Sequence, residues 1–281
     1  MKLSKIHFIL CLLLFFSCSE KKKADPTIEQ ETSKSSYLEA PEFQIILDSA
    51  NVKGAIVVYD LRKNQYYSND FKWAKIQRLP ASTFKIPNSI IALETGVVEN
   101  DSTLFKWGGE RRFLKIWEQD LVLKDAFHFS CVPCYQEVAR KIGIKRMNEY
   151  LAKLGYGEMN VDSTNIDSFW LEGDSKINQL QQIDFLRRFY ESKLPISNRT
   201  ENIMKKMMIM DKKADFTLSG KTGLANGNEE NNGWFIGFAE TAGQTLFFAT
   251  NIEPSAGLDA QQFLSSRKEV TLKAIKQISA Y

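Results

Sequence analysis

The chain has 281 residues, of which 43% are hydrophobic and 25% are charged, and its formal net charge is +3 at pH 7. These values are close to average for a soluble globular protein, and the length is sufficient for one large domain or two lobes with a real core. Nothing in the charge balance indicates a nucleic-acid partner, and internal repeats and low-complexity tracts are absent from the sequence.

The first residues have the pattern of an export signal. Lys2 and Lys5 precede an unbroken apolar run over residues 8–16, which is too short to span a bilayer but suits a signal peptide. Cys18 follows the small Ser17, as at a bacterial lipoprotein cleavage site, so we expect Cys18 to be lipidated. Plain signal cleavage is the alternative, because two phenylalanines precede Ser17. No later segment is apolar enough to cross a membrane, so we expect a periplasmic protein whose only membrane anchor is this lipid.

Few residues remain for metal or imidazole chemistry beyond the leader. These are Cys131, Cys134 and His128. A zinc site built from them would have at most three clustered Cys or His ligands, so we expect no metal. A nucleophilic enzyme with this composition needs a base other than histidine, and we expect His128 to be a surface or interface residue.

The predicted elements begin with two strands and a helix. Residues 54–60 have the pattern of a buried strand, and residues 65–68 form its hairpin partner after a turn. A helical pattern follows from Ser82 to Glu94, and Gly96 is a suitable stop.

Residues 97–210 are predicted to be mostly helical, and strands return after them. Apolar residues recur with the helical period, and glycines separate the segments. The predicted helices cover residues 134–142, 144–154, 183–190 and 200–210, and the later strands cover residues 216–223, 233–240 and 244–251. Turns are predicted at residues 231–233 and 241–243, and a final helix at residues 265–279.

This order of elements predicts an α+β fold, in which an antiparallel sheet is flanked by helices and an all-helical lobe is inserted into the middle of the chain. The predicted divisions are a signal peptide (1–17), a polar tether (18–36) and one folded domain (37–281). Within that domain, residues 37–80 and 211–281 form the α/β lobe and residues 81–210 form the mainly helical lobe.

The first chemical motif is Ser82-Thr83-Phe84-Lys85, which follows Pro80 at the predicted start of a helix. Unpaired backbone N–H groups at a helix start favour developing negative charge. Residues three apart share a helix face, so Lys85 lies next to the Ser82 hydroxyl and is the natural base for it. Alone, the pattern is also typical of a helix cap followed by a solvated lysine. The apolar flanking residues favour the chemical interpretation.

Two further motifs follow in the chain. Lys221-Thr222-Gly223 lies on a predicted strand, where the cation would hold negative charge, the hydroxyl would donate to a carboxylate, and the glycine would let a ligand approach the backbone. Ser130 begins a predicted helix two residues before Val132. By itself Ser130 is best explained as an N-cap, but with the other motifs it becomes a candidate proton shuttle. The three motifs in this order form the signature of penicillin-recognising serine acyltransferases.

Residues 37–281 resemble the class D β-lactamases, the oxacillinase type. The resemblance lies in the segments Pro80–Ser89, Ser130–Gln136, Phe169–Gly173, Ser219–Gly223 and Gly233–Phe235. Val132 at the third position of the second motif is similar to class D and differs from class A, which has Asp and Asn after the serine. Glu158 departs from the family, which often has Asn at this position.

The resemblance implies a serine β-lactamase that hydrolyses penicillin-type antibiotics through an acyl-enzyme on Ser82 and so confers resistance. It implies that Lys85 is carbamylated (N6-carboxylysine) by CO₂ and acts as the general base, with a hydrogen bond from the Trp170 indole. Carbamylation requires neutral lysine, which burial favours. Ser130 and Lys221 would then protonate the leaving nitrogen. CO₂ or bicarbonate is the only small molecule that this implies besides the substrate.

The resemblance also implies how substrate is bound. Arg267 and Thr222 would hold the substrate carboxylate, and the backbone N–H groups of Ser82 and Leu224 would form the oxyanion hole. Val132 and Gly223 would complete the substrate site.

Several alternatives stay open at this point. The chain is either a β-lactamase, a β-lactam sensor that is acylated without turnover, or a D,D-peptidase. It is a monomer or a homodimer, with no nucleic-acid partner. Cys131 and Cys134 are either two small buried thiols, which we favour, or an oxidised pair, and a redox enzyme lacks its βαβ context here.

Overall fold

The computed structural model describes residues 35–226 and 231–279. The predicted signal peptide, Cys18 and nearly all of the predicted tether lie outside these residues. Within the described ranges, no helix combines the length and the apolar character that are needed to cross a membrane.

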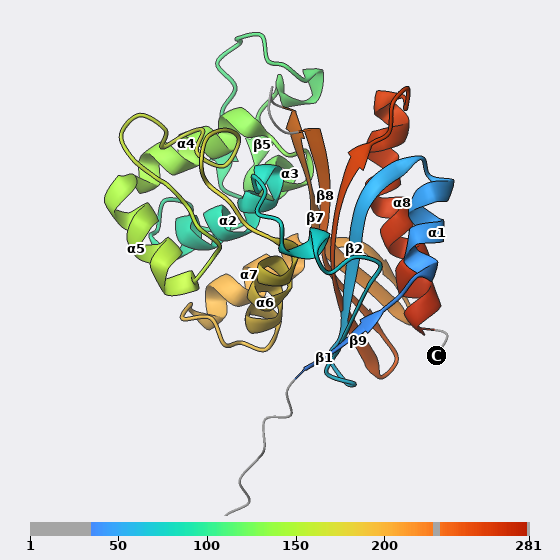
Figure 1. Ribbon diagram of the computed structural model, residues 1–281. Coiled ribbons are helices and arrows are strands. Elements are labelled where there is room, and N and C mark those ends of the chain that lie inside the picture. Colours follow the sequence, from blue (N-terminus) through green and yellow to red (C-terminus); the bar gives the residue numbers. More distant parts are fainter. Residues whose placement is uncertain (1–34, 227–230, 280–281) are drawn as a thin grey trace, which may run out of the picture. The chain divides into compact units, whose positions relative to one another are not determined.

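The centre of the fold is a seven-stranded sheet (Figure 1). Its strands lie in the order β1 (Ser36–Glu39), β3 (Gln65–Ser68), β2 (Val52–Asp60), β9 (Gln244–Pro254), β8 (Asn231–Thr241), β7 (Phe216–Asn226) and β6 (Ile209–Lys213). All neighbours are antiparallel except β1, which runs parallel to β3 and makes the sheet mixed. The predicted antiparallel sheet is therefore confirmed, with the addition of one parallel edge strand.

Helices α1 (Glu42–Ser49) and α8 (Ala260–Ser279) cover one face of the sheet (Figure 1). Phe43 and Leu47 of α1 and Val270 and Ala274 of α8 are buried in one hydrophobic cluster with inward residues of the strands. Helix α1 was not predicted, although four of its eight residues (Phe43, Ile45, Ile46 and Leu47) are apolar, because it is only about two turns long.

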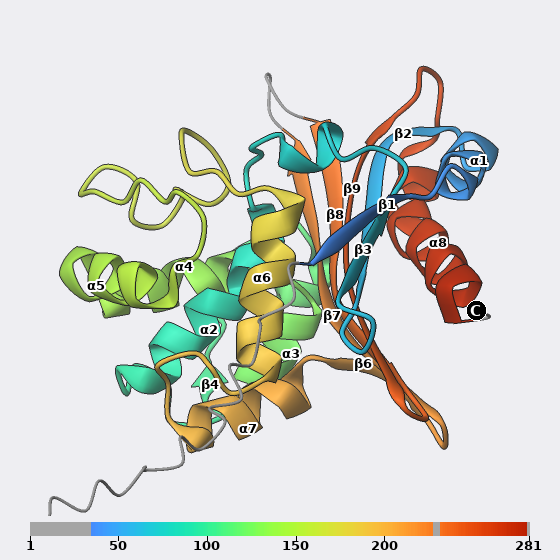
Figure 2. The same ribbon diagram turned by 60° about the horizontal axis from the view of Figure 1, so that its bottom comes forward.

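The opposite face is covered by the helical segment, and Figure 2 shows α6 lying against the strands. Its helices are α2 (Lys85–Glu94), α3 (Leu123–His128), α4 (Val132–Ile142), α5 (Ile144–Leu154), α6 (Gln179–Tyr190) and α7 (Asn198–Met207). A small second sheet pairs β4 (Leu104–Phe105) with β5 (Leu121–Val122). Short 3₁₀ helices occur at η1 (Trp73–Lys75), η2 (Ala81–Phe84) and η3 (Lys115–Trp117). The insertion of a helical lobe between strands of one sheet is confirmed.

Two sequence predictions at element boundaries were wrong. The helix predicted to reach Met210 ends at Met207, and the chain enters edge strand β6 at Ile209. Residues 231–233 were predicted as a turn but begin β8. Asn232 is buried there and accepts a 2.9 Å hydrogen bond from Asn251 Nδ2, so a residue typical of turns serves inside the sheet.

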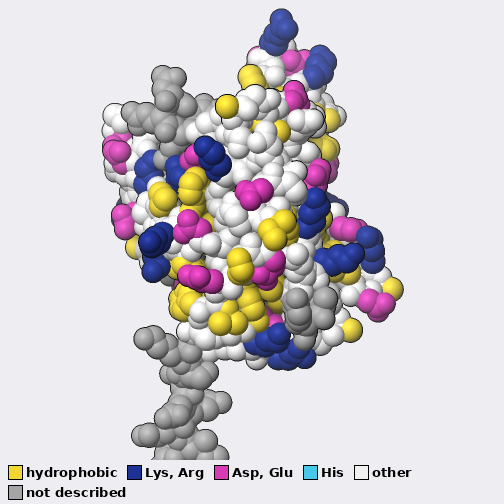
Figure 3. Space-filling view, turned by 45° about the vertical axis from the view of Figure 1, so that its right-hand side comes forward, with side chains coloured by type: hydrophobic (Ala, Val, Ile, Leu, Met, Phe, Trp, Pro, Cys, Tyr) yellow, Lys and Arg dark blue, Asp and Glu magenta, His cyan; other side chains and the backbone are white. Residues whose placement is uncertain are grey.

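The exposed charges are mixed. Figure 3 shows Lys and Arg side chains interspersed with Asp and Glu over the face that it presents. Ion pairs on the described surface, such as Arg140–Asp167 at 2.6 Å and Lys141–Glu137 at 2.6 Å, join neighbouring charges of opposite sign. Such exposed pairs contribute little to stability.

Candidate active site

Ser82 lies in a tight turn between two lobes of the fold. The turn is the 3₁₀ helix η2, which leads directly into α2 at Lys85. Ala81 begins the turn with a φ of 49°, and its N–H donates to the carbonyl of Trp170 at 2.9 Å. The Thr83 hydroxyl donates to the carbonyl of Pro80 at 2.6 Å. The predicted helix start at Ser82 is therefore a 3₁₀ turn, and left-handed backbone at a non-glycine residue is typical of a functional site that its surroundings hold in place.

Lys85 is the first residue of α2, and its amine points at the nucleophile. Its Nζ lies 3.1 Å from Ser82 Oγ and 5.0 Å from the centre of the Tyr135 ring. The side chain is fully buried, and among the described residues no carboxylate forms an ion pair with it. Burial without a counter-charge lowers the pKa of Lys85 to about 7. A large fraction of this amine is therefore neutral near pH 7 and can accept a proton.

Lys221 and Ser130 face each other across the same site. Lys221 Nζ donates to Ser130 Oγ and, at 3.0 Å, to the carbonyl of Thr222. The side chain is 4% exposed, and its pKa is lowered well below the usual value, first by burial and then by the positive charges of Lys85 and Arg267. An ammonium group held in this way gives up a proton readily, so the pair can deliver a proton through the serine hydroxyl.

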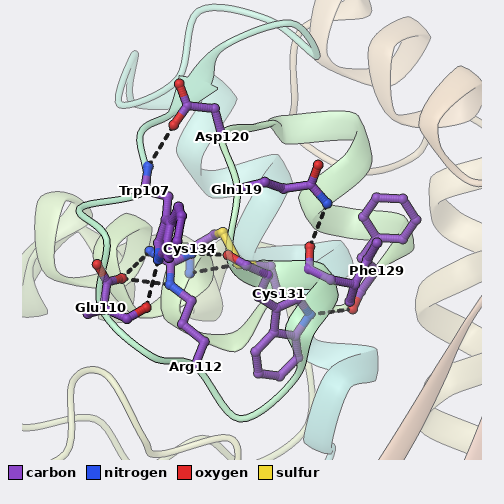
Figure 4. The surroundings of a disulfide bond; sticks show 10 residues. Trp107, Glu110, Arg112, Gln119, Asp120, Phe129, Cys131 and Cys134 are labelled. Atoms are coloured by element: carbon purple, nitrogen blue, oxygen red, sulfur yellow. Dashed lines mark hydrogen bonds and ion pairs between the residues drawn. A yellow bond between two sulfur atoms is a disulfide. The ribbon is translucent and has the colours of Figure 1, made fainter.

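Ser130 links α3 to α4 and is not the helix cap that its position had indicated. Cys131 is the N-cap of α4, and its Sγ accepts from the backbone N–H of Cys134 at 3.2 Å. The two cysteines form a disulfide, so the oxidised pair is found rather than the two thiols that we had favoured (Figure 4). Ser130 itself has a φ of 53°, which is another left-handed residue in the site.

Gly223 allows β7 to approach the Ser82 turn. A Cβ at this position would lie 3.1 Å from Thr83 Cγ2 and 3.2 Å from the carbonyl oxygen of Pro80. The space beside this glycine is thus filled by the chain itself. The structure thus shows close packing of the strand against the turn at Gly223, and the predicted approach of a ligand to this backbone stays a prediction. Thr222 and Leu224 lie on either side and are half-buried, as is Val132 at the start of α4.

Arg267 reaches from α8 to the same strand. Its Nη1 donates to the Gly223 carbonyl at 2.7 Å, and its Nε donates to the Leu264 carbonyl at 3.0 Å. Burial lowers its pKa to about 10, so the group is still cationic at neutral pH. Gly233 makes room for this side chain, because a Cβ there would lie 2.6 Å from Arg267 Cδ.

Trp170 is fully buried and stacks on Phe84 with ring centroids 5.5 Å apart. Within the described part of the chain, its Nε1 has no hydrogen-bond partner. A buried indole N–H normally finds an acceptor, because leaving it unpaired costs about 1–3 kcal/mol. This donor lies beside Phe84, the residue before Lys85, and it fits an acceptor group that the described residues do not supply.

Comparisons with known proteins agree on the family. Residues 47–276 match the model of the penicillin binding protein transpeptidase domain. The chain is 39% identical to β-lactamase OXA-48 of Klebsiella pneumoniae over 80% of its length and 83% of that protein. It is also 39% identical to β-lactamase OXA-10 of Pseudomonas aeruginosa, over 80% of its length and 84% of that protein. The class D β-lactamase structure from Sebaldella termitidis superposes with a TM-score of 0.83 at 34% identity, covering 88% of this chain and 99% of that one.

The chain belongs to the class D β-lactamases. The fold and the serine β-lactamase activity that the sequence predicts are those of this family. The sheet with its helical insertion is the β-lactamase/transpeptidase fold.

Sequence reasoning missed the supporting roles of two residues in this class D site. Trp234 Nε1 donates to the Leu79 carbonyl at 2.9 Å and so ties β8 to the segment before Ser82. Tyr135 provides the aromatic wall beside Lys85, and its hydroxyl lies 2.7 Å from Ser89 Oγ. Both residues fall in segments that carried the family resemblance, but a buried contact between distant segments leaves no periodic signal.

Glu158 occupies the position that departs from the family pattern. Its backbone forms a bridge to Lys176, with the Glu158 N–H donating to the Lys176 carbonyl at 2.8 Å. The main chain at this position therefore has a structural role that does not depend on the side chain. Among the described residues, no three His, Cys, Asp or Glu side chains gather as a metal ligand set.

Proposed function

We propose that this class D β-lactamase hydrolyses penicillin-type antibiotics through an ester on Ser82, with the side chain at position 85 as general base. The observation that carries the proposal is the 3.1 Å approach of a fully buried lysine amine to the serine hydroxyl. A serine hydroxyl is a weak nucleophile unless a base removes its proton, and His128 is exposed at the end of α3, so it is no candidate for that base.

The acylation step follows from the positions of four side chains. Ser82 Oγ forms a bond to the ring carbonyl carbon as its proton passes to the group at position 85. The ring C–N bond then breaks, and the nitrogen takes a proton from Ser130 Oγ, which Lys221 replenishes through their hydrogen bond. Backbone N–H groups of Ser82 and Leu224 would stabilise the oxyanion. In deacylation the base removes a proton from water, and the water oxygen forms a bond to the ester carbonyl carbon. The C–O bond to Ser82 then breaks, and Ser82 Oγ takes the proton back from the base.

We further propose that CO₂ modifies the base. The neutral amine of Lys85 is the form that reacts, and the unpaired Nε1 of Trp170 is a donor that suits the product. When present, this N-carboxylate supplies an oxygen base with a free lone pair. Lys85 and Trp170 are the residues that would hold it.

We propose that the substrate carboxylate binds beside β7. Lys221 and Arg267 donate to the neighbouring carbonyls of Thr222 and Gly223, so two basic side chains lie along the part of the strand that carries the Thr222 hydroxyl. Arg267 stays charged at neutral pH even though it is largely buried, which suits an anionic ligand. We also propose export to the periplasm and lipidation of Cys18, which incorporation of labelled lipid into the chain and its loss in Cys18→Ala would test.

Hydrolysis of a chromogenic cephalosporin, with and without added bicarbonate, tests the mechanism. We expect turnover that bicarbonate accelerates and that Ser82→Ala abolishes. Unchanged turnover in Ser82→Ala would contradict the proposal. A burst of acylation without turnover would indicate a sensor, and release of D-alanine from a cell-wall pentapeptide mimic would indicate a D,D-peptidase.

A further inference from the structure

Ser130 is held in an unfavourable backbone conformation, and the Cys131–Cys134 disulfide adjoins it directly. With a φ of 53°, Ser130 adopts the left-handed region that residues with a Cβ rarely occupy. Such a conformation persists only where several contacts of the surrounding structure hold it in place.

Backbone hydrogen bonds hold the approach to Ser130 from α3. The Ser130 N–H donates to the Phe127 carbonyl at 3.2 Å, and the Cys131 N–H donates to the Ala126 carbonyl at 2.9 Å. The carbonyl of Phe129 accepts from Trp117 Nε1 at 2.9 Å. Figure 4 shows Phe129 and the segment that carries Trp107 and Asp120 around the disulfide. These bonds fix the chain before Ser130 and at Cys131, and the Tyr135 N–H donates to the Cys131 carbonyl at 3.2 Å across the first turn of α4.

The disulfide also spans the start of α4. It joins the N-cap residue of α4 to the third residue of the helix, and both sulfur-bearing side chains are buried, at 0% and 3% exposure. Cys131 has a non-helical backbone (φ −55°, ψ 99°), so the helix does not extend backwards through it into Ser130. The cross-link therefore maintains the sharp change of direction at which the Ser130 hydroxyl meets Lys221.

Other groups on α4 do not depend on the cross-link in this way. The Tyr135 hydroxyl is held by Ser89 at 2.7 Å, and the ring is fully buried against Lys85. Loss of the disulfide would thus loosen Ser130 more than it loosens the wall of the Lys85 pocket.

We propose that Cys131 and Cys134, through their disulfide, are positioning residues for proton delivery by Ser130. The inference rests on the function proposed above for Ser130. Loss of the disulfide should slow acylation selectively, because a displaced Ser130 hydroxyl slows cleavage of the ring C–N bond. Hydrolysis of the Ser82 ester breaks a C–O bond instead and does not need this donor. Misplacement of a catalytic group by about 1 Å can cost up to about 100-fold in rate.

The test separates acylation from deacylation in single-turnover experiments with a chromogenic cephalosporin. Cys131→Ser/Cys134→Ala removes the cross-link but keeps a good N-cap. We expect its acylation rate constant to fall about tenfold while deacylation stays within about twofold. Ser197→Ala is the matched control, because Ser197 caps α7 and accepts from the Thr200 N–H at 3.2 Å, far along the chain from the site. It should lower the melting temperature without slowing acylation.

A double-mutant cycle with Ser130→Ala decides whether the effect acts through this serine. In the Ser130→Ala background, removal of the disulfide should cause no further loss of acylation. An equal loss in both backgrounds, or acylation at the parent rate in the cysteine variant, would overturn the inference. If Ser130→Ala alone acylates as fast as the parent, the failure lies in the role proposed for Ser130 instead.

Reduction of the parent enzyme covers the case in which the cysteine variant does not fold. A water-soluble phosphine cleaves the S–S bond to two thiols and becomes the phosphine oxide, with water supplying the oxygen and the protons. Once two additional thiols titrate in protein that keeps its near-UV circular dichroism, acylation should fall by the same factor of about ten. An unchanged rate with two additional thiols would also overturn the inference.

Discussion

Lys85 Nζ lies 3.1 Å from Ser82 Oγ in a pocket that gives the ammonium form no carboxylate partner among the described residues. The structure buries the Lys85 amine in surroundings that favour its neutral form over the ammonium form. Stability and reactivity are coupled at this residue, and the first two predictions follow from that coupling.

Lys85→Met should abolish turnover and make the protein more stable. In the folded state the pKa of Lys85 is about 7, against 10.5 in the unfolded chain, so the unfolded chain binds more protons between these values. The lysine therefore destabilises the fold fully below pH 7, and the penalty disappears as the pH rises towards 10.5. We expect Lys85→Met to gain about 4 kcal/mol at pH 7 and to lose most of that advantage near pH 10. Urea unfolding at both pH values measures this.

The control for this experiment is Lys145→Met, at an exposed position of α5. It should change stability by less than about 0.5 kcal/mol at either pH. A Lys85→Met protein less stable than the parent at pH 7 would contradict the account of a desolvated amine.

Activity should fall as the pH drops through about 7. Below this value Lys85 is protonated, and neither the amine nor its CO₂ adduct is available as a base. We expect kcat/KM to decrease about tenfold per pH unit on the acid side, and added bicarbonate should partly restore it near the midpoint. A profile that is flat from pH 5 to 8 would exclude Lys85 as the titrating base.

Trp170→Phe should raise the bicarbonate concentration that is needed for half-maximal activity. The phenyl ring keeps the stacking on Phe84 but removes the unpaired Nε1–H. Because that donor has no partner among the residues that the structure describes, its removal should not in itself lower the stability of the bicarbonate-free enzyme. Trp234→Phe is the matched variant, since it removes a donor that is bonded to Leu79. It should cost about 1–3 kcal/mol and leave the bicarbonate dependence unchanged. The reverse pattern would argue against a carbamate beside Trp170.

Gly223→Ala should slow acylation by moving β7 away from the Ser82 turn. The added methyl would meet Thr83 Cγ2 at 3.1 Å, which is tighter than ordinary van der Waals contact. We expect kcat/KM to fall about tenfold to 100-fold. Thr83→Ser keeps the hydroxyl that donates to the Pro80 carbonyl but removes Cγ2, so the double variant should recover part of the loss. Steady-state kinetics of the two single variants and the double variant measure this, and no recovery would show that the contact with Thr83 is not responsible.

The sequence predicted the reacting residues better than it predicted the contacts that hold them in place. Ser82 and Lys85 lie close together because residues at positions i and i+3 share one face of a helical turn. This local rule holds even though the turn is 3₁₀ rather than α. The hydrogen bond between Lys221 and Ser130 joins residues that are 91 positions apart, and only the order of motifs indicated it. The space that Gly233 leaves for Arg267 depends on how α8 lies on β8, which no local pattern records. Edge strands β1 and β6 were missed because they are short and exposed, so they carry little hydrophobic alternation.

The most direct test of the central claim is carbon-13 NMR of the enzyme equilibrated with labelled bicarbonate. The account predicts one protein-bound carbamate resonance at pH 8, which disappears at pH 5, is absent from Lys85→Met, and persists in Lys145→Met. Full activity in the parent enzyme with no such resonance, or the same resonance in Lys85→Met, would contradict the claim that a dry, neutral amine at position 85 becomes the base for Ser82.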